Sequence, residues 1–175
     1  GKGVWKSTDA GKTWKHAGLR DVGNIGGVRV HPTNPSVALV AAIGDPFRPT
    51  NARGIYRTTD GGATWQRTLF VSDSTGAVDV EYNAGDPNIV YAAMWRAERK
   101  PWTIISGAME GGLYKSTDGG ATWAKLTNGL PSGLFGKANI AVSKANPNRV
   151  YALIEAKPGM GLYRSDDAGA SFSLV

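Results

Sequence analysis

The chain has 175 residues, a net charge of +6 and no cysteine, and 41% of its residues are hydrophobic. This composition excludes a disordered chain, disulfides and thiolate metal sites. No apolar run reaches the length of a membrane span and the basic residues form no run of five or more, so we expect no transmembrane segment and no nucleic-acid partner.

Strands are predicted along the whole chain, and no stretch has the 3.6-residue period of a long helix. The first two predicted strands are short, one at residues 4–6 and one that begins at Trp14. Three longer sets follow, each with an alternating strand, a turn that contains proline, an apolar run, a Gly-x-Tyr-basic strand and a strand that opens on an aromatic residue. The predicted strands are 28–31, 37–42, 54–57 and 64–67; then 78–81, 89–94, 112–115 and from 123; then 140–143, 150–154, 161–164 and from 172.

One eight-residue motif occurs four times, always between the third and fourth strands of a set. It contains a hydroxyl residue, Asp, a small residue, Gly, a second hydroxyl residue and a closing aromatic. The copies are residues 7–14, 58–65, 116–123 and 165–172. A repeat of about fifty residues with four strands is typical of a β-propeller blade. A β-sandwich is the alternative, but it does not explain why the same turn recurs in every unit.

We therefore predict an all-β chain of about three and a half propeller blades. The expected boundaries are a half blade at 1–18 and blades at 19–70, 71–128 and 129–175. Because the chain begins without Met and stops just after a repeat, we expect it to be a fragment of a larger propeller. The remaining blades would come from the parent polypeptide or from a second chain, since an incomplete propeller leaves sheet edges uncovered.

The motif residues are predicted to be structural. Asp accepts hydrogen bonds in a turn, Gly permits positive φ, and the aromatic ring packs between sheets. Aspartates on successive blades lie too far apart to form a catalytic pair, and they supply too few ligands for calcium. We predict neither a metal site nor a cofactor. The residues concerned are Asp9, Gly11, Trp14, Asp60, Gly62, Trp65, Asp118, Gly120, Trp123, Asp167, Gly169 and Phe172.

This motif resembles the Asp-box, or bacterial neuraminidase repeat, and the blades look most like those of bacterial sortilin (Vps10-type) propellers. The resemblance covers the whole chain and implies the propeller fold, together with a secreted, periplasmic or cell-envelope location. It does not fix the function, because the Asp-box also occurs in sialidases, xyloglucan-cleaving glycosidases, sorting receptors and photosystem assembly factors.

Candidate ligand contacts lie in the irregular loops at the face opposite the motif turns. The segment 95–102 combines indole rings with cations, which can stack on sugars or hold anionic groups. The alternative is a loop that packs on its neighbour with the cations in water. The predicted ligand-binding residues are Trp95, Arg96, Arg99, Lys100, Trp102, Arg20, Arg48 and Arg53.

From these features we expect a non-catalytic scaffold or recognition module that binds a protein or glycan partner, or a subunit of a larger complex. The alternative is a fragment of an Asp-box glycoside hydrolase, either sialidase-like or xyloglucanase-like. A xyloglucan-cleaving enzyme needs two aspartates on opposing blades. Asp21, Asp45, Asp73 and Asp79 are available, and nothing in the sequence singles out a pair.

Overall fold

The structure is a computed structural model that describes residues 2–175. The described residues are all β, and they contain no helix with the length and apolar character needed to cross a bilayer. A short pair of strands comes first, β1 (Trp5–Lys6) and β2 (Lys15–His16). The first full sheet contains β3 (Asn24–Val30), β4 (Ala38–Gly44), β5 (Gly54–Thr58) and β6 (Gln66–Leu69).

The next two sheets complete the chain. The second contains β7 (Thr75–Tyr82), β8 (Val90–Lys100), β10 (Gly112–Ser116) and β11 (Ala124–Lys125), with β9 (Thr103–Ser106) paired to the end of β8. The third contains β12 (Leu134–Val142), β13 (Val150–Lys157), β14 (Gly161–Ser165) and β15 (Ser173–Leu174).

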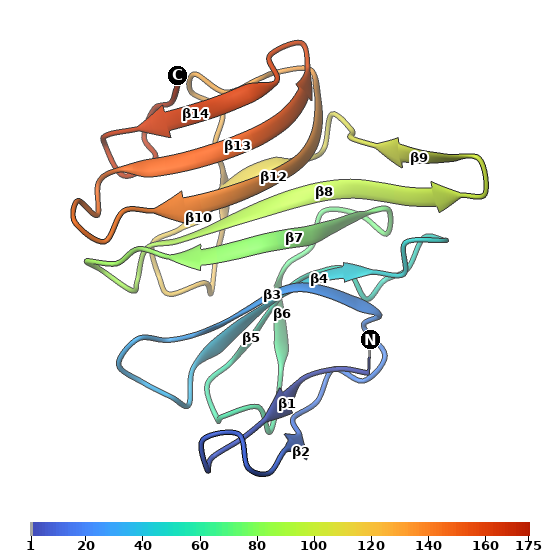
Figure 1. The fold of residues 1–175 in the computed structure, drawn as a ribbon, viewed down its shortest axis with the longest axis vertical. Helices are drawn as coiled ribbons and strands as arrows, with labels where there is room; N and C mark the ends of the chain where they lie inside the picture. The colour runs from blue at the N-terminus through green and yellow to red at the C-terminus, as the bar shows by residue number, and fades with distance from the viewer. Residues whose placement is uncertain (1) are drawn as a thin grey trace.

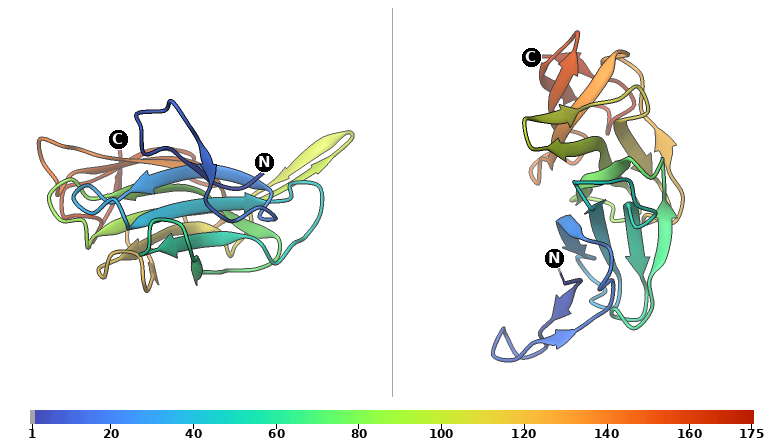
Figure 2. Two further views of the ribbon diagram at one scale, coloured as in Figure 1. Left: turned by 90° about the horizontal axis from the view of Figure 1, so that it is seen from below. Right: turned by 90° about the vertical axis from the view of Figure 1, so that its right-hand side faces the viewer.

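Each full sheet is antiparallel, and its four main strands are hydrogen-bonded in chain order. The sheets follow one another along a curved stack, from the N-terminal pair at the bottom of Figure 1 to the C-terminal sheet at the top. The curvature is plain in the side view of Figure 2. Strand β7 contacts both β3 and β12, so the first strands of the three sheets are spatial neighbours. This is the predicted all-β arrangement of four-stranded blades.

The structure matches β7 to the first strand of the preceding blade differently from the prediction. Val80 is opposite Ala92, just as Val28 is opposite Val40 in the preceding blade. The strand prediction had matched Val78 to Val28, which is wrong by two residues. A shift of two residues leaves the alternation of apolar and polar side chains unchanged, so the pattern alone fits both matches. The spacing to the proline turn gives the observed match, since Val28 and Val80 lie seven residues before Pro35 and Pro87 respectively.

The second difference is in the segment predicted as an irregular loop, residues 95–111. Strand β8 continues to Lys100 and folds back as β9, with Ala97 opposite Ser106 and Lys100 opposite Thr103. The β8–β9 hairpin projects beyond the rest of the sheet stack (Figure 1). A two-residue turn at Pro101 and Trp102 connects the strands.

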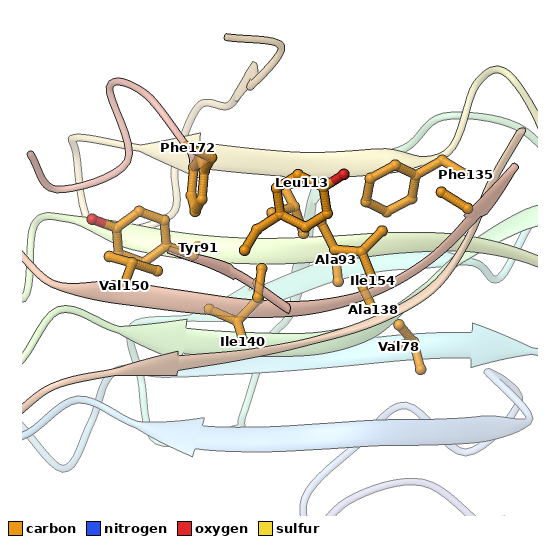
Figure 3. Close-up of a cluster of buried hydrophobic side chains, with 13 residues drawn as sticks. Val78, Tyr91, Ala93, Leu113, Phe135, Ala138, Ile140, Val150, Ile154 and Phe172 are labelled. Carbon is orange, nitrogen blue, oxygen red and sulfur yellow. The ribbon is translucent and has the colours of Figure 1, made fainter. Parts of the chain in front are cut away.

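Two hydrophobic clusters fill the spaces between adjacent sheets. The first lies between the β3–β6 sheet and the β7–β11 sheet, and its larger members include Leu39, Ile55 and Met94, all 0% exposed. The second lies between the β7–β11 sheet and the C-terminal sheet; Figure 3 shows Tyr91, Leu113, Phe135 and Phe172 in it. The core is therefore divided into layers, one for each junction between the three full sheets, as in other repeat architectures.

Candidate functional site

The four Asp-box turns lie at one end of the sheets and share one hydrogen-bond pattern. In the third copy, Asp118 Oδ1 accepts from Ser116 Oγ at 2.7 Å and from Thr122 N at 2.9 Å, and Oδ2 accepts from Thr122 Oγ1 at 2.6 Å. The other three turns repeat these bonds at Asp9, Asp60 and Asp167. Each carboxylate is thus occupied by its own turn.

These bonds favour the ionised carboxylate. The hydrogen bond from the Thr13 hydroxyl is the largest cause that lowers the pKa of Asp9 to about 2. The corresponding bonds from Thr64 and Thr122 hold the pKa of Asp60 and of Asp118 well below the usual range. Two consecutive residues in each turn have positive φ, for example Gly119 at 71° and Gly120 at 86°. The turn therefore needs small residues at both positions, and it offers no free carboxylate for chemistry.

The opposite end of the sheets carries the loops that differ between blades. There, the segment after β2 and the segment after β4 enclose an open pocket of about 380 Å³. Four of its lining residues are charged, and Phe47, which also lines it, is 65% exposed. The charged lining residues are Arg20, Asp21, Asp45 and Arg48. The structure thus brings two predicted ligand-binding arginines together with two of the four candidate aspartates.

The carboxylate of Asp45 is held in a defined position within this pocket. It accepts a hydrogen bond from Phe47 N at 2.9 Å and forms an ion pair with Arg48 Nε at 2.9 Å. The backbone bond from Phe47, followed by the bond from Arg48, lowers the pKa of Asp45. Asp45 is therefore ionised at neutral pH and suits a role as base or charge stabiliser rather than as proton donor.

Arg53 has a different role from the one predicted. Its side chain is 1% exposed, and its guanidinium donates to the carbonyl oxygens of Ile43 at 2.7 Å, Asp45 at 2.6 Å and Arg48 at 3.2 Å. Burial lowers the pKa of Arg53, while nearby carboxylates oppose this effect. The prediction that Arg53 contacts a ligand is corrected: the side chain is buried, and its Nη1 and Nη2 atoms bond the loop that carries Asp45 and Phe47.

The β8–β9 hairpin lies next to the pocket loop, since Arg99 N donates to Pro46 O at 2.6 Å. Its predicted contacts are not equivalent. Trp102, at the tip, is 81% exposed, whereas Trp95 packs against the second core cluster and donates its Nε1 proton to Ser106 Oγ at 2.8 Å. Arg99 is exposed, Arg96 is partly buried, and Lys100 is paired with Glu98.

The remaining candidate aspartates lie outside the pocket. Asp79 is 7% exposed and ties the first strands of three blades together: Oδ2 accepts from Ile140 N at 2.9 Å, and Oδ1 lies 3.7 Å from Arg29 Nη2. The backbone carbonyl of Asp73 accepts from Thr50 N at 2.8 Å. Asp73 thus braces the pocket loop through its main chain.

Sequence reasoning missed two glutamates at this end of the sheets. Glu110 Oε1 accepts from Ser72 Oγ at 2.6 Å and from Thr75 Oγ1. Desolvation opposes its ionisation, but these two hydrogen bonds outweigh it and lower the pKa of Glu110. Glu155 Oε2 accepts from Lys137 N at 3.0 Å and from Ser106 Oγ at 2.7 Å, and these bonds lower its pKa. Neither glutamate belongs to a repeated motif, so no sequence signal marked them.

Comparison with known proteins identifies relatives of this chain. A model of the Sortilin-Vps10 family, described as sortilin, neurotensin receptor 3, matches residues 2–159. The chain is 26% identical to a xyloglucanase from Paenibacillus sp, over 99% of this chain and 19% of that protein. It is 29% identical to a xyloglucanase from Hypocrea jecorina, over 93% of this chain and 19% of that protein. The chain thus spans about a fifth of the length of these curated relatives.

Solved structures share the fold at low sequence identity. An ancestral GH74 enzyme superposes with a TM-score of 0.72 at 20% identity, over 99% of this chain and 21% of the other. The Niastella koreensis GH74 enzyme gives a TM-score of 0.71 at 22% identity, over 98% of this chain and 26% of the other. These likenesses confirm the predicted β-propeller fold.

The relatives contradict the first functional prediction. Proteins named as xyloglucanases favour the alternative, a glycoside hydrolase fragment, over a non-catalytic recognition module. The predicted resemblance to sortilin-type propellers is confirmed, because the family model covers most of the chain. On this match, the chain belongs to the Sortilin-Vps10 family.

Proposed function

We propose that this chain is a segment of a glycoside hydrolase that acts on xyloglucan or a related β-glucan, and that the pocket at Asp45 holds part of the polysaccharide. The observation that carries the proposal is the pocket itself, in which two aspartates and two arginines surround an exposed phenylalanine. This combination suits a sugar ligand, because aromatic rings stack on the apolar faces of sugars and charged side chains bind sugar hydroxyl groups.

Asp45 fits one of the two carboxyl roles in glycoside hydrolysis. Such enzymes use one carboxylic acid to protonate the leaving oxygen and one carboxylate to activate water or attack the sugar. The hydrogen bonds to Asp45 hold it ionised, which suits the second role. Trp102, exposed on the neighbouring hairpin, extends the binding surface beyond the pocket. Because a polysaccharide is too large to enter a cell readily, the enzyme would act outside it.

The test is hydrolysis by the polypeptide that carries this chain, measured as release of reducing ends from xyloglucan, from an unbranched β-glucan and from a sialoside. We expect turnover of xyloglucan. Asp45→Asn should lower kcat at least about 100-fold, because the amide oxygen keeps the bond to Phe47 N but carries no charge. Phe47→Ala should raise KM with a smaller change in kcat, because stacking is lost.

Trp14→Ala is the matched control, since Trp14 is also an exposed aromatic residue, 58% accessible, but belongs to an Asp-box turn at the other end of the sheets. It should leave kcat and KM unchanged. Absence of turnover on every glucan would refute the hydrolase proposal. Full activity of Asp45→Asn would refute the role of Asp45 while leaving the substrate class in place.

A further inference from the structure

The β8–β9 hairpin is tied to the C-terminal sheet by a chain of side-chain hydrogen bonds. Trp95 Nε1 donates to Ser106 Oγ at 2.8 Å, and Ser106 Oγ donates to Glu155 Oε2 at 2.7 Å. Trp95 and Ser106 lie on β8 and β9 where the hairpin leaves its sheet, whereas Glu155 lies on β13 of the following blade. A carboxylate of the third full sheet therefore holds the base of a hairpin that belongs to the second.

A β-bulge in β12 gives this carboxylate a second bond. Two residues of β12, Gly136 and Lys137, lie opposite the single residue Glu155 of β13. The extra residue of a bulge is left without a partner in the strand ladder, so its backbone groups need another one. Glu155 Oε2 accepts from Lys137 N at 3.0 Å. One oxygen atom thus joins the bulge of β12 to Ser106 of the hairpin.

Gly136 leaves the space that this carboxylate occupies. A Cβ atom at residue 136 would lie 2.5 Å from Glu155 Oε2 and 2.6 Å from Glu155 Cδ. A side chain there would therefore push the carboxylate away from both of its donors. The glycine and the glutamate fit together at the point where the hairpin meets the third sheet.

The position of Glu155 carries a different residue in each full sheet. The residue before it in β13 pairs with the first glycine of β14, and the same pairing in the other two sheets places Ile43 and Trp95 at this position. Both of these side chains are hydrophobic and pack against the second core cluster. The blade itself therefore does not require an acceptor here, and the carboxylate needs a separate explanation.

The opposite edge of the hairpin is held by the pocket loop. Arg99 N donates to Pro46 O at 2.6 Å, in the loop that also carries Asp45. The hairpin thus spans from a loop of the first full sheet to Glu155 of the third. Because both edges are held, its direction is fixed, and so is the place of Trp102, the 81% exposed residue at its tip.

We propose that Glu155 is a positioning residue for the β8–β9 hairpin, and that it holds the hairpin in the direction that keeps Trp102 beside the pocket at Asp45. This role rests on the proposed function, in which Trp102 extends the polysaccharide-binding surface. Glu155 lies outside the residues that line the pocket and acts through Ser106. The role needs an acceptor atom rather than a charge, since one oxygen accepts both bonds.

Hydrogen exchange in the full polypeptide that carries this chain tests the link without any glycan. Glu155→Ala should speed exchange of the Arg99 amide about fivefold, the effect of weakening one hydrogen bond, although Arg99 bonds on the far edge of the hairpin. Glu155→Gln is the matched control and should leave this amide unchanged, because the amide oxygen of glutamine can accept both bonds. Faster exchange at Lys137 alone would show a purely local role and would overturn the proposal.

Gly136→Ala displaces the carboxylate without removing it. We expect the same faster exchange of the Arg99 amide as in Glu155→Ala, because the new Cβ atom takes the place of Oε2. Adding Gly136→Ala to Glu155→Ala should cause no further change at Arg99, since no carboxylate is left to displace. Unchanged exchange at Arg99 in Gly136→Ala would overturn the proposal.

Kinetics on xyloglucan give the functional readout. Glu155→Ala should raise KM about fivefold and change kcat less than about twofold, because the hairpin binds the substrate and does not react with it. Trp102→Ala should raise KM by at least as much, and adding Glu155→Ala to it should cause no further rise. An equal rise from Glu155→Ala in both backgrounds would overturn the proposal. Absence of turnover on every glucan would refute the hydrolase proposal instead, and exchange at Arg99 would then decide the role of Glu155.

Discussion

Replacing Arg53 tests whether one buried side chain holds the pocket loop in shape. Arg53→Met keeps most of the side-chain volume but removes the guanidinium. Three carbonyl oxygens, those of Ile43, Asp45 and Arg48, then lose a charged donor. Hydrogen bonds to a charged group contribute about 1.5–3 kcal/mol, and a buried acceptor left without a donor costs about as much. We expect a loss of this size in the free energy of unfolding.

Arg48→Met is the matched control in the same loop. The Arg48 side chain is 79% exposed, and its ion pair with Asp45 lies at the surface. Such pairs contribute about 0–1 kcal/mol. Urea unfolding followed by tryptophan fluorescence measures both variants, and hydrogen exchange at Thr50 N reports the loop itself. If Arg53→Met lost less than about 1 kcal/mol, or no more than Arg48→Met, the reasoning would be refuted.

Three further predictions concern the Asp-box end and the blade junctions. The Asp-box carboxylates have depressed pKa values in the folded state. Their contribution to the free energy of unfolding is therefore complete above about pH 4, the ordinary aspartate range, and is lost as the pH falls towards about 2, the pKa of Asp9. Melting temperatures measured from pH 7 to pH 2 should show this decline, and Asp118→Asn should make it shallower. Trp65→Phe removes the bond from Nε1 to Ala17 O at 2.7 Å and should cost about 1 kcal/mol, with faster hydrogen exchange in the N-terminal pair of strands. Gly129→Ala would place a Cβ atom 1.8 Å from Phe172 O at a φ of +73°, and should lower the unfolding free energy by about 3 kcal/mol or more.

Each of these predictions has an outcome that contradicts it. An unchanged acid slope in Asp118→Asn would mean that the turn carboxylates do not govern acid stability. Unaltered exchange in Trp65→Phe would separate the indole bond from the attachment of the first strand pair. Gly119→Ala is the control for the glycine variant, because alanine already occupies the same Asp-box position at residues 10 and 168 with positive φ. It should be tolerated, with a cost below about 1 kcal/mol.

The fold was predictable because local signals in this chain agree with the global arrangement. Proline turns, Gly-x-Tyr strands and Asp-boxes recur in fixed order, so one blade predicts the next. The match of β7 to the other blades failed because the pattern is ambiguous. A shift of two residues leaves the alternation of Val78 and Val80 unchanged, and only the spacing to Pro87 separates the two registers.

The candidate site was less predictable, because its residues are marked by contacts rather than by sequence pattern. Arg48 and Arg53 are five residues apart in one loop, yet the first is exposed and the second is buried among carbonyl groups. Asp21 lies just before β3 and Asp45 just after β4, and they share a pocket because Asn24 pairs with Gly44 in the folded sheet. Choosing this pair over Asp73 and Asp79 requires knowing which segments face each other.

The division of the core into separate junction layers has a mechanical consequence. Each blade contacts only its neighbours, so a pulling force applied to the two ends should remove blades one at a time rather than break the whole stack at once. Each released blade frees about 50 residues, or roughly 170 Å of chain at about 3.4 Å per residue. In a single-molecule stretching experiment, the first and smallest extension step should be the N-terminal strand pair, which is attached to the next blade by the bonds from Lys6 Nζ to Gly61 O and from Trp65 Nε1 to Ala17 O.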